Sequence, residues 1–314
     1  MSKKLNILVV GSNGMVGSSI VRKLSNSKKV NTVTSSTRKD TDLFSFKETK
    51  KLIESSSPDV LINAAAKVGG ILYNNTKRTE FILENLKINM NLLESCIEHP
   101  KIKIINLGSS CIYPLNAENP IKESEFMNGQ LEPTNSPYAM AKLSSIELGR
   151  ALNIQYGNSV INLMPTNLYG PNDFFHPEKS HVIPSLLFRM HKAKVNKDES
   201  FSIWGSGSPK REFLFVDELA ECIEFLINKE PKQDLFNVGS GEEVTIKELA
   251  LKIKNVINFE GELEFDSSMP DGNPRKLLDS SRINDLGWKS KLSLDEGLEI
   301  TYKWFLENLN FIRS

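Results

Sequence analysis

An apolar run from Leu5 to Val10 leads directly into three closely spaced glycines, and apolar residues then recur at helical spacing. This order predicts a buried strand, a tight turn and a helix. In such a turn one glycine allows the sharp bend, one lets the backbone approach a pyrophosphate, and one lets the helix pack on the strand. The helix amides and dipole would then hold the phosphates. The predicted dinucleotide-binding turn consists of Gly11, Ser12, Asn13, Gly14, Met15, Val16 and Gly17.

Short apolar runs continue to alternate with helical patterns through the first half of the chain. Runs of strand length occur at Val60 to Ile62, Ile102 to Leu107 and Val160 to Leu163, and the segment from Phe81 to Ile97 has helical periodicity. Alternating strands and helices predict a parallel sheet that is covered by helices on both faces. The expected fold class is therefore α/β, with a doubly wound Rossmann sheet.

The regular alternation ends after Pro171. The stretch from Asn172 to Pro209 contains prolines, a glycine turn and a helical pattern from Ser185 to Lys192. We expect this stretch to begin a smaller α/β lobe over the sheet. A helix from Thr245 to Ile257 and a C-terminal helix through Trp304 would complete that lobe.

Two later apolar segments, Phe213 to Val216 and Phe236 to Val238, are expected to return to the main sheet. The predicted organisation has two parts. They are a dinucleotide-binding domain over residues 1–171 with returns near 212–240, and a substrate-binding lobe over residues 172–211 and 241–314.

Charge and composition exclude several classes of partner. The 39 basic residues balance 39 acidic ones, so no net field attracts nucleic acid or an anionic membrane. No apolar run approaches the ~20 residues of a membrane span, and the first residues lead into a strand rather than a signal-peptide core. The three cysteines, Cys96, Cys111 and Cys222, lack metal-ligand spacing. We therefore expect reduced thiols, no metal site and a cytoplasmic location.

The second strand, ending near Val33, should present the residue that contacts the adenosine ribose. An NAD site usually has Asp or Glu at this place, whereas this chain continues with Ser35-Ser36-Thr37-Arg38-Lys39. The planar guanidinium of Arg38 suits a 2′-phosphate, and Lys39 adds charge. The segment therefore favours NADPH over NADH. The alternative is that both cations are ordinary solvated surface residues.

A Tyr-x-x-x-Lys segment, Tyr138 to Lys142, indicates acid chemistry. Residues four apart share one face of a helix, so the phenol and the ammonium would point into the same space. A free phenol titrates near pH ~10, and a fixed cation lowers its pKa by stabilising the phenolate. Tyr138 is therefore expected to donate a proton, with a chance pattern on an amphipathic helix as the alternative.

Taken together, these motifs resemble the extended short-chain dehydrogenase/reductase family of nucleotide-sugar enzymes. The resemblance runs nearly end to end and is carried by the glycine turn, Ala64-Ala65-Ala66, Ser109, Tyr138-x-x-x-Lys142 and Asn167-Leu168-Tyr169-Gly170-Pro171. Longer matches resemble the branch of that family that makes GDP-L-fucose. These matches are the segments at residues 64–71, 108–114, 131–135, 164–171, 180–184 and 274–279.

The narrower resemblance implies a reaction. The family branch converts GDP-4-keto-6-deoxy-D-mannose, also written GDP-4-dehydro-6-deoxy-D-mannose, to GDP-L-fucose with NADP(H), usually as a homodimer. The C3 and C5 centres are epimerised and C4 is reduced. One residue departs from the family pattern, because Asn13 stands where close relatives often have Arg. The expected contact to a 2′-phosphate therefore depends on Arg38.

The resemblance also assigns catalytic roles. Ser109 and Tyr138 would donate hydrogen bonds to the C4 oxygen, and Lys142 would bind the nicotinamide ribose. Cys111 would be the base and His181 the acid of the epimerisations, since thiols and imidazoles titrate within reach of neutral pH. Judged by residue type alone, a packing cysteine and a structural histidine are the better interpretation. The cofactor contacts implied beyond the glycine turn, Arg38 and Lys142 are Asp42, Leu43, Ala64, Ala65, Leu107, Gly108, Pro165, Thr166, Asn167, Leu168 and His181.

Cations are needed for the substrate's diphosphate because the chain has no compensating net charge. Arg189 and Arg211 are the candidates that the resemblance implies. Trp204 is a further candidate for substrate contact, with a packing anchor as the alternative. Asp271 and Lys276 are candidates as well, with an ordinary loop as the alternative.

Two other functions remain open at this stage. A different nucleotide-sugar epimerase or reductase on the same fold would use Tyr138 and Lys142 and leave Cys111 and His181 incidental. A redox-sensing protein would bind the dinucleotide without turnover, although such proteins can lose the Tyr and Lys that this chain retains. Identification of the product tests the first alternative, and measurement of cofactor consumption tests the second.

Overall fold

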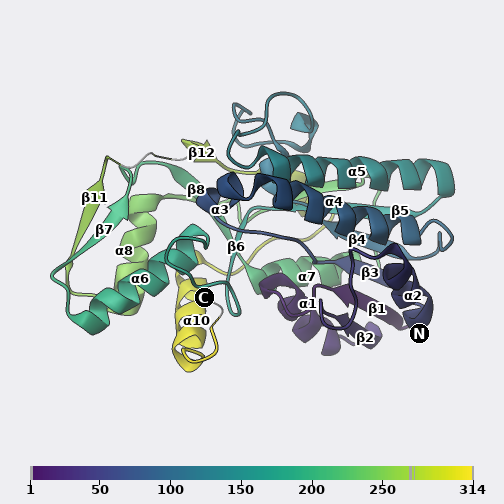
Figure 1. Ribbon diagram of the computed structural model, residues 1–314, viewed down its shortest axis with the longest axis horizontal. Helices are drawn as coiled ribbons and strands as arrows, with labels where there is room; N and C mark the ends of the chain where they lie inside the picture. Colours follow the sequence, from purple (N-terminus) through teal and green to yellow (C-terminus); the bar gives the residue numbers. More distant parts are fainter. Residues whose placement is uncertain (1–2, 269–270, 272, 313–314) are drawn as a thin grey trace.

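A six-stranded parallel sheet forms the centre of the larger part of the molecule (Figure 1). The computed structural model describes residues 3–268, 271 and 273–312. Every pairing in this sheet is parallel. Its strands, in spatial order, are β2 (Val30–Ser36), β1 (Leu5–Val10), β3 (Val60–Asn63), β4 (Lys103–Leu107), β5 (Ser159–Pro165) and β9 (Leu235–Val238).

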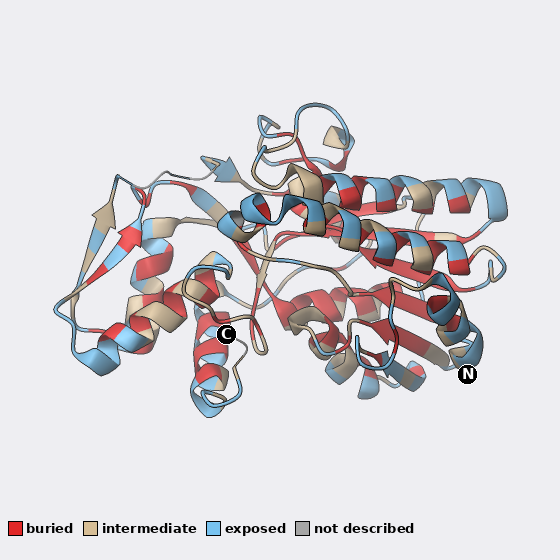
Figure 2. Ribbon diagram, viewed as in Figure 1, coloured by how far each residue is buried: buried red, intermediate tan, exposed pale blue. Residues whose placement is uncertain are grey.

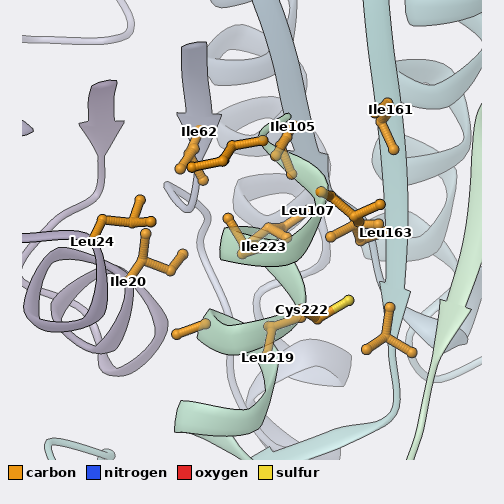
Figure 3. Close-up of a cluster of buried hydrophobic side chains, with 14 of the residues drawn as sticks. Ile20, Leu24, Ile62, Ile105, Leu107, Ile161, Leu163, Leu219, Cys222 and Ile223 are labelled. Atoms are coloured by element: carbon orange, nitrogen blue, oxygen red, sulfur yellow. The ribbon is translucent and has the colours of Figure 1, made fainter. Parts of the chain in front are cut away.

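Helices cover both faces of this sheet, which confirms the doubly wound α/β fold. One face packs against α1 (Met15–Ser25) and α7 (Val216–Leu226), and Figure 3 shows their apolar side chains meeting those of β3, β4 and β5. The other face packs against α2 (Phe46–Ser56), α4 (Arg78–Ser95) and α5 (Ser136–Tyr156). Because both faces are covered, the inner strands of the sheet are buried along almost their whole length (Figure 2), whereas the edge strand β2 is largely exposed.

The strand order reverses beside β1, and this reversal locates the site. The chain runs from β1 outward to β2 and then crosses to β3 on the other side of β1. In open α/β sheets, ligands bind beyond the carboxyl ends of the strands at such a switch point. The glycine turn follows β1, and Ala64 and Ala65 follow β3, so both segments lie at this point.

A smaller lobe stands beside the main sheet, on the left in Figure 1. It has its own core between α6 (Val182–Asn196), α8 (Ile246–Ile257) and α10 (Leu294–Glu307). Both α8 and α10 begin with a capping box, at Thr245 and Ser293, which satisfies the free amides of their first turns. The strands of this lobe are β7 (Ser200–Trp204), β11 (Glu262–Asp266), β8 (Lys210–Phe215), β10 (Glu243–Thr245) and β12 (Arg275–Lys276).

The structure corrects one predicted strand and confirms another. Phe236 to Val238 lie in β9 of the main sheet, as predicted. The prediction that Phe213 to Val216 return to that sheet is wrong, because β8 pairs with β10, β12 and β6 (Asn167–Tyr169) instead. An apolar run marks a buried strand without saying which sheet buries it. The chain returns to the main sheet one element later, as helix α7.

The remaining elements are short connections. They are α3 (Ile71–Thr76), η1 (Ser110–Ile112), η2 (Glu123–Glu125) and α9 (Ser281–Asp285). Among the residues that the structure describes, none of the helices combines the length and the apolar character needed to cross a bilayer.

Candidate active site

The glycine turn after β1 is too crowded for side chains. Gly11 has φ +72°, and a Cβ there would lie 2.7 Å from the Ala65 Cα. A Cβ on Gly17 would lie 2.8 Å from both the Gly11 carbonyl carbon and the Ser12 Cα. Non-bonded atoms do not approach a Cβ this closely, so α1 can pack so near the turn only because glycine stands at position 17.

The turn leaves backbone amides at the start of α1 without a protein partner in their own helix. Among the described residues, no side chain caps the first turn of α1, and that turn contains no acidic residue. Asn172, which the motif analysis overlooked, holds the turn from outside by donating to the Asn13 carbonyl and the Ser18 Oγ, both at 3.1 Å. An uncapped helix N-terminus behind a fixed turn fits a diphosphate.

Arg38 follows β2 and points into solvent with 75% of its side chain exposed. Its Nη2 lies 3.4 Å from Glu84 Oε2, and its guanidinium lies 5.2 Å from the centroid of the Phe44 ring. The other Glu84 oxygen accepts a 2.6 Å hydrogen bond from Lys67 Nζ. Arg38 therefore has a long, exposed contact that a phosphate can replace. Nothing in the local sequence around Glu84 indicates this pairing.

The other cofactor candidates lie at the carboxyl edge of the sheet or just beyond it. Ala64 and Ala65 follow β3, Leu107 ends β4 and Gly108 follows it, and Pro165 ends β5. Their positions follow from parallel pairing, which brings all strand ends to one edge. Thr166, Asn167 and Leu168 lead from that edge into β6, and Asp42 and Leu43 lie in the loop after β2.

Tyr138 and Lys142 share one face of α5, as their spacing predicts, but their electrostatics differ from the prediction. Lys142 Nζ donates a 2.7 Å hydrogen bond to the Leu107 carbonyl and lies 5.8 Å from the centroid of the Tyr138 ring. Burial lowers the pKa of Lys142 to about 8. Burial and the nearby Cys111 raise the pKa of Tyr138. The expectation that Lys142 lowers this pKa is therefore wrong here, because spacing along a helix does not reveal desolvation.

Ser109 and Cys111 lie together at the end of β4, where η1 turns the chain. Ser109 Oγ accepts the Cys111 N–H at 3.3 Å, and it lies 2.8 Å from Cys111 Sγ, with either atom able to donate. The Ser109 side chain also lies near the Tyr138 phenol, where it favours the phenolate and partly opposes the effect of burial on the pKa of Tyr138. One hydroxyl therefore lies beside both the candidate base and the candidate acid.

The three thiols have different surroundings. Cys111 is partly exposed, whereas Cys96 and Cys222 are fully buried. Burial raises the pKa of Cys96 to about 12 and that of Cys222 further. Cys222 packs between α7 and the sheet in Figure 3. Cys111 is therefore the thiol available for chemistry.

His181 immediately precedes α6 and is exposed to solvent. The protein around it nevertheless desolvates the imidazolium and lowers its pKa below the ordinary value. Its segment is held against the loop after β3, because the Gly70 N–H donates to the Lys179 carbonyl at 2.9 Å. Within the described residues, no hydrogen bond joins the His181 side chain to Cys111.

Arg189 and Arg211 are cations without an acidic partner in hydrogen-bond contact among the described residues. Arg189 Nη2 donates to the Ser202 carbonyl at 2.6 Å, and Arg211 Nη1 donates to the Lys210 carbonyl at 2.8 Å. Burial lowers the pKa of both guanidinium groups. Lys276 on β12 pairs in register with Arg211 on β8, and burial lowers its pKa as well. Three desolvated cations that have no carboxylate in hydrogen-bond contact within the described part of the chain suit an anionic ligand.

Trp204 and Asp271 lie at the turn that follows β7. Trp204 is 48% exposed, and its ring lies 5.6 Å from the Arg189 guanidinium, so it is not a buried packing anchor. Asp271 accepts hydrogen bonds from the Ser206 N–H at 2.9 Å and the Ser206 Oγ at 2.6 Å. In this structure Asp271 fixes the turn beside Trp204.

Glu212 is a site-supporting residue that the sequence did not indicate. Its buried carboxylate accepts the N–H groups of Gly241 at 2.8 Å and Leu278 at 3.1 Å. Its backbone carbonyl accepts hydrogen bonds from Thr166 Oγ1 and Asn167 Nδ2. Glu212 thus ties the end of β5 to the strands that carry Arg211 and Lys276.

Comparison with known proteins agrees with the motifs along the whole chain. Residues 7–239 match the NAD dependent epimerase/dehydratase family. GDP-L-fucose synthase 1 of Arabidopsis thaliana is 49% identical over 98% of this chain and 95% of that protein. GDP-L-fucose synthase of Escherichia coli strain K12 is 44% identical over 100% of both chains.

A solved structure has the same architecture. The NADP-bound GDP-L-fucose synthetase from Naegleria fowleri has a TM-score of 0.89 and 28% sequence identity, covering 100% of this chain and 98% of that one. The family resemblance inferred from the glycine turn, the Tyr-x-x-x-Lys segment and the longer matches is confirmed. The chain belongs to the GDP-L-fucose synthase branch of the NAD dependent epimerase/dehydratase family.

Proposed function

We propose that this protein converts GDP-4-keto-6-deoxy-D-mannose to GDP-L-fucose, by epimerisation at C3 and C5 and reduction at C4 with NADPH. The observation that carries the proposal is the hydrogen-bonded pair of Ser109 and Cys111 next to Tyr138 and Lys142, at the carboxyl edge of the sheet. A base, a hydroxyl donor and a proton donor around one point are what epimerisation next to a ketone and reduction of that ketone both require.

Epimerisation begins with the acidity of the hydrogens beside the C4 ketone. Removal of a proton from C3 or C5 produces an enolate, whose negative oxygen needs hydrogen-bond donors. Ser109 and Tyr138 supply these donors in the proposal, and the Cys111 thiolate removes the proton. His181 returns a proton to the opposite face. Its lowered pKa makes the imidazolium scarcer at neutral pH but a stronger acid once it forms.

Reduction uses the same oxygen site. NADPH, when bound, supplies the hydride for C4. Tyr138 donates its proton to the C4 oxygen, and the raised pKa of this phenol keeps it protonated at neutral pH. Lys142 binds the nicotinamide ribose through the ammonium that now contacts the Leu107 carbonyl.

The cofactor is NADP(H), and its proposed contacts divide between backbone and side chain. The uncapped first turn of α1 holds the diphosphate. Arg38 binds the 2′-phosphate and exchanges its 3.4 Å contact with Glu84 for a charge-assisted fork. Asn13 supplies no positive charge, so Arg38 is the main determinant of preference for NADPH.

The smaller lobe receives the nucleotide-sugar in this proposal. Arg189 and Arg211 meet the diphosphate because they are desolvated and lack a carboxylate in hydrogen-bond contact among the described residues. Trp204 contributes its exposed ring, Asp271 orders the adjoining turn, and Lys276 adds charge near the reacting sugar. The division proposed for the chain is cofactor binding in residues 1–171 and substrate binding in residues 172–211 and 241–314.

We further infer a homodimer and a reducing compartment. Helices α4 and α5 lie side by side on the outside of the main sheet (Figure 1) and carry the exposed apolar residues Leu83, Met90 and Met140. Leu83 and Met90 are seven residues apart and share one face of α4. A second copy covering these helices would bury them, which sedimentation can test. Three unpaired thiols fit the cytoplasm.

The test is to mix the protein with NADPH and GDP-4-keto-6-deoxy-D-mannose and to identify the sugar by NMR. GDP-L-fucose is the expected product, formed with stoichiometric loss of NADPH absorbance. A sugar inverted at one centre or at neither would assign a different epimerase or reductase activity. Binding of NADPH without its consumption would contradict the proposal altogether.

A further inference from the structure

The hydroxyl of Ser109 has several polar neighbours but only one proton. It accepts the Cys111 N–H, lies 2.8 Å from Cys111 Sγ, and has the Tyr138 phenol close by. A serine hydroxyl has one O–H donor and two acceptor lone pairs. The backbone N–H uses one lone pair. The single Ser109 proton must therefore point either to the sulfur or to an oxygen.

We propose that the Ser109 hydroxyl is a two-position switch that couples the protonation of Cys111 to the hydrogen bond on the substrate's C4 oxygen. The inference rests on the proposed function. Before abstraction the sulfur is a thiolate, and the Ser109 O–H donates to it. Cys111 then takes a proton from C3 or C5, and the C–H electron pair moves toward C4 to give an enolate.

Protonation of the sulfur reverses the hydrogen bond. The new S–H donates to Ser109 Oγ, and the freed Ser109 O–H turns to the enolate oxygen. The negative charge leaves the sulfur and appears on the C4 oxygen, and the single hydroxyl proton follows it. His181 then protonates the carbon from the opposite face, and the switch resets when the partly exposed Cys111 S–H loses its proton to solvent water.

Other groups near Cys111 act on it from two neighbouring elements. The Tyr138 phenol and the Lys142 ammonium face it from α5, and the Lys276 ammonium, on which Glu132 acts, faces it from β12. These groups act through space, whereas Ser109 is in hydrogen-bond contact with the sulfur. Removal of the Ser109 hydroxyl therefore changes the direct contact and leaves these surrounding groups in place.

The first measurement is the rate of iodoacetamide alkylation against pH in the ligand-free protein. Cys96 and Cys222 are fully buried, so the reaction reports Cys111, and Cys111→Ser gives the background. Ser109→Ala removes a donor to the thiolate and should raise the midpoint of the profile by about one pH unit, with roughly tenfold slower alkylation at pH 7. Ser109→Thr keeps the hydroxyl and should restore the wild-type midpoint.

The second measurement is C4 reduction in the Cys111→Ser background, where the sulfur is absent. Adding Ser109→Ala should slow this reduction about a hundredfold, because the C4 oxygen loses a donor. An unchanged alkylation midpoint in Ser109→Ala overturns the switch, and so does unchanged reduction in the double variant. NADPH binding checks that each variant is folded, and Ser109→Gly replaces Ser109→Ala if that variant does not fold. Product analysis of the wild type tests the proposed function separately.

Discussion

Backbone groups form most of the cofactor end of this molecule, whereas side chains form most of the substrate end. At the cofactor end, the turn around Gly11 and Gly17 leaves no room for a Cβ, and the first turn of α1 offers uncapped amides. At the substrate end, Arg189, Arg211 and Lys276 come from three different elements of the smaller lobe and its connecting strands. The two ends should therefore respond to different kinds of substitution.

This difference also determines which substitutions each end of the molecule can tolerate. A backbone site depends on close packing and is lost when any atom is added. A side-chain site depends on particular functional groups and can lose one of its reactions while the fold stays intact. Ser109, Cys111 and Tyr138 lie where the two ends meet, because the first two follow β4 at η1 and α5 carries the third.

The largest effect is expected for Cys111→Ser, which changes one functional group and keeps the shape. Serine is not a comparable base at neutral pH without a partner, so epimerisation should fall by about a thousandfold. Hydride transfer to C4 still has Tyr138, Ser109 and Lys142. The variant should slowly form an unepimerised 6-deoxy sugar, which NMR of the product identifies. GDP-L-fucose formation at the wild-type rate would mean that Cys111 only packs.

Tyr138→Phe should have the opposite effect to Cys111→Ser, with loss of reduction rather than of epimerisation. The variant removes the proton donor to the C4 oxygen and leaves the thiol and imidazole in place. C4 reduction should fall by about a hundredfold or more, while some exchange of the C3 and C5 hydrogens continues. Reaction in deuterium oxide measures both by NMR. Reduction at the wild-type rate would show that the phenol is not the acid.

Gly17→Ala tests the backbone end by adding a single methyl group. Its Cβ would overlap the Gly11 carbonyl and Ser12, so the turn or α1 must move. We expect a loss of about 2 to 3 kcal/mol in the free energy of unfolding, together with weaker NADPH binding. Thermal denaturation and cofactor titration measure the two effects.

Gly157→Ala is the matched control for that substitution. Gly157 has a positive φ, of +71°, unlike Gly17, and no heavy atom lies within 4 Å of its hypothetical Cβ. Only left-handed strain acts at Gly157, about 1 kcal/mol, and NADPH binding should not change. A loss of NADPH affinity in Gly157→Ala equal to that in Gly17→Ala would show that crowding at the turn does not explain the requirement for glycine at position 17.

The sequence predicted the backbone end more completely than the side-chain end. Glycine spacing and strand alternation determine the position of the turn at the switch point, and both can be read locally. Residue type alone did not distinguish Cys111 from the buried Cys222, because burial depends on the finished fold. The same limitation explains the error over the pKa of Tyr138. Glu84 and Glu212 had no local signal, since their partners are distant in sequence.

The smallest effect is expected for Arg38→Ala, which removes the main side-chain contribution to the backbone-built cofactor end. A charge-assisted fork to phosphate is worth ~1.5 to 3 kcal/mol, so NADPH affinity should fall about tenfold or more and NADH affinity should change little. Lys39→Ala is the control, since that neighbouring cation would add only diffuse charge. Titration of both cofactors against both variants measures the preference. Equal losses of NADPH and NADH affinity in Arg38→Ala would show that this guanidinium does not contact the 2′-phosphate. The cofactor end would then depend on backbone groups even more than the contrast with the substrate end suggests.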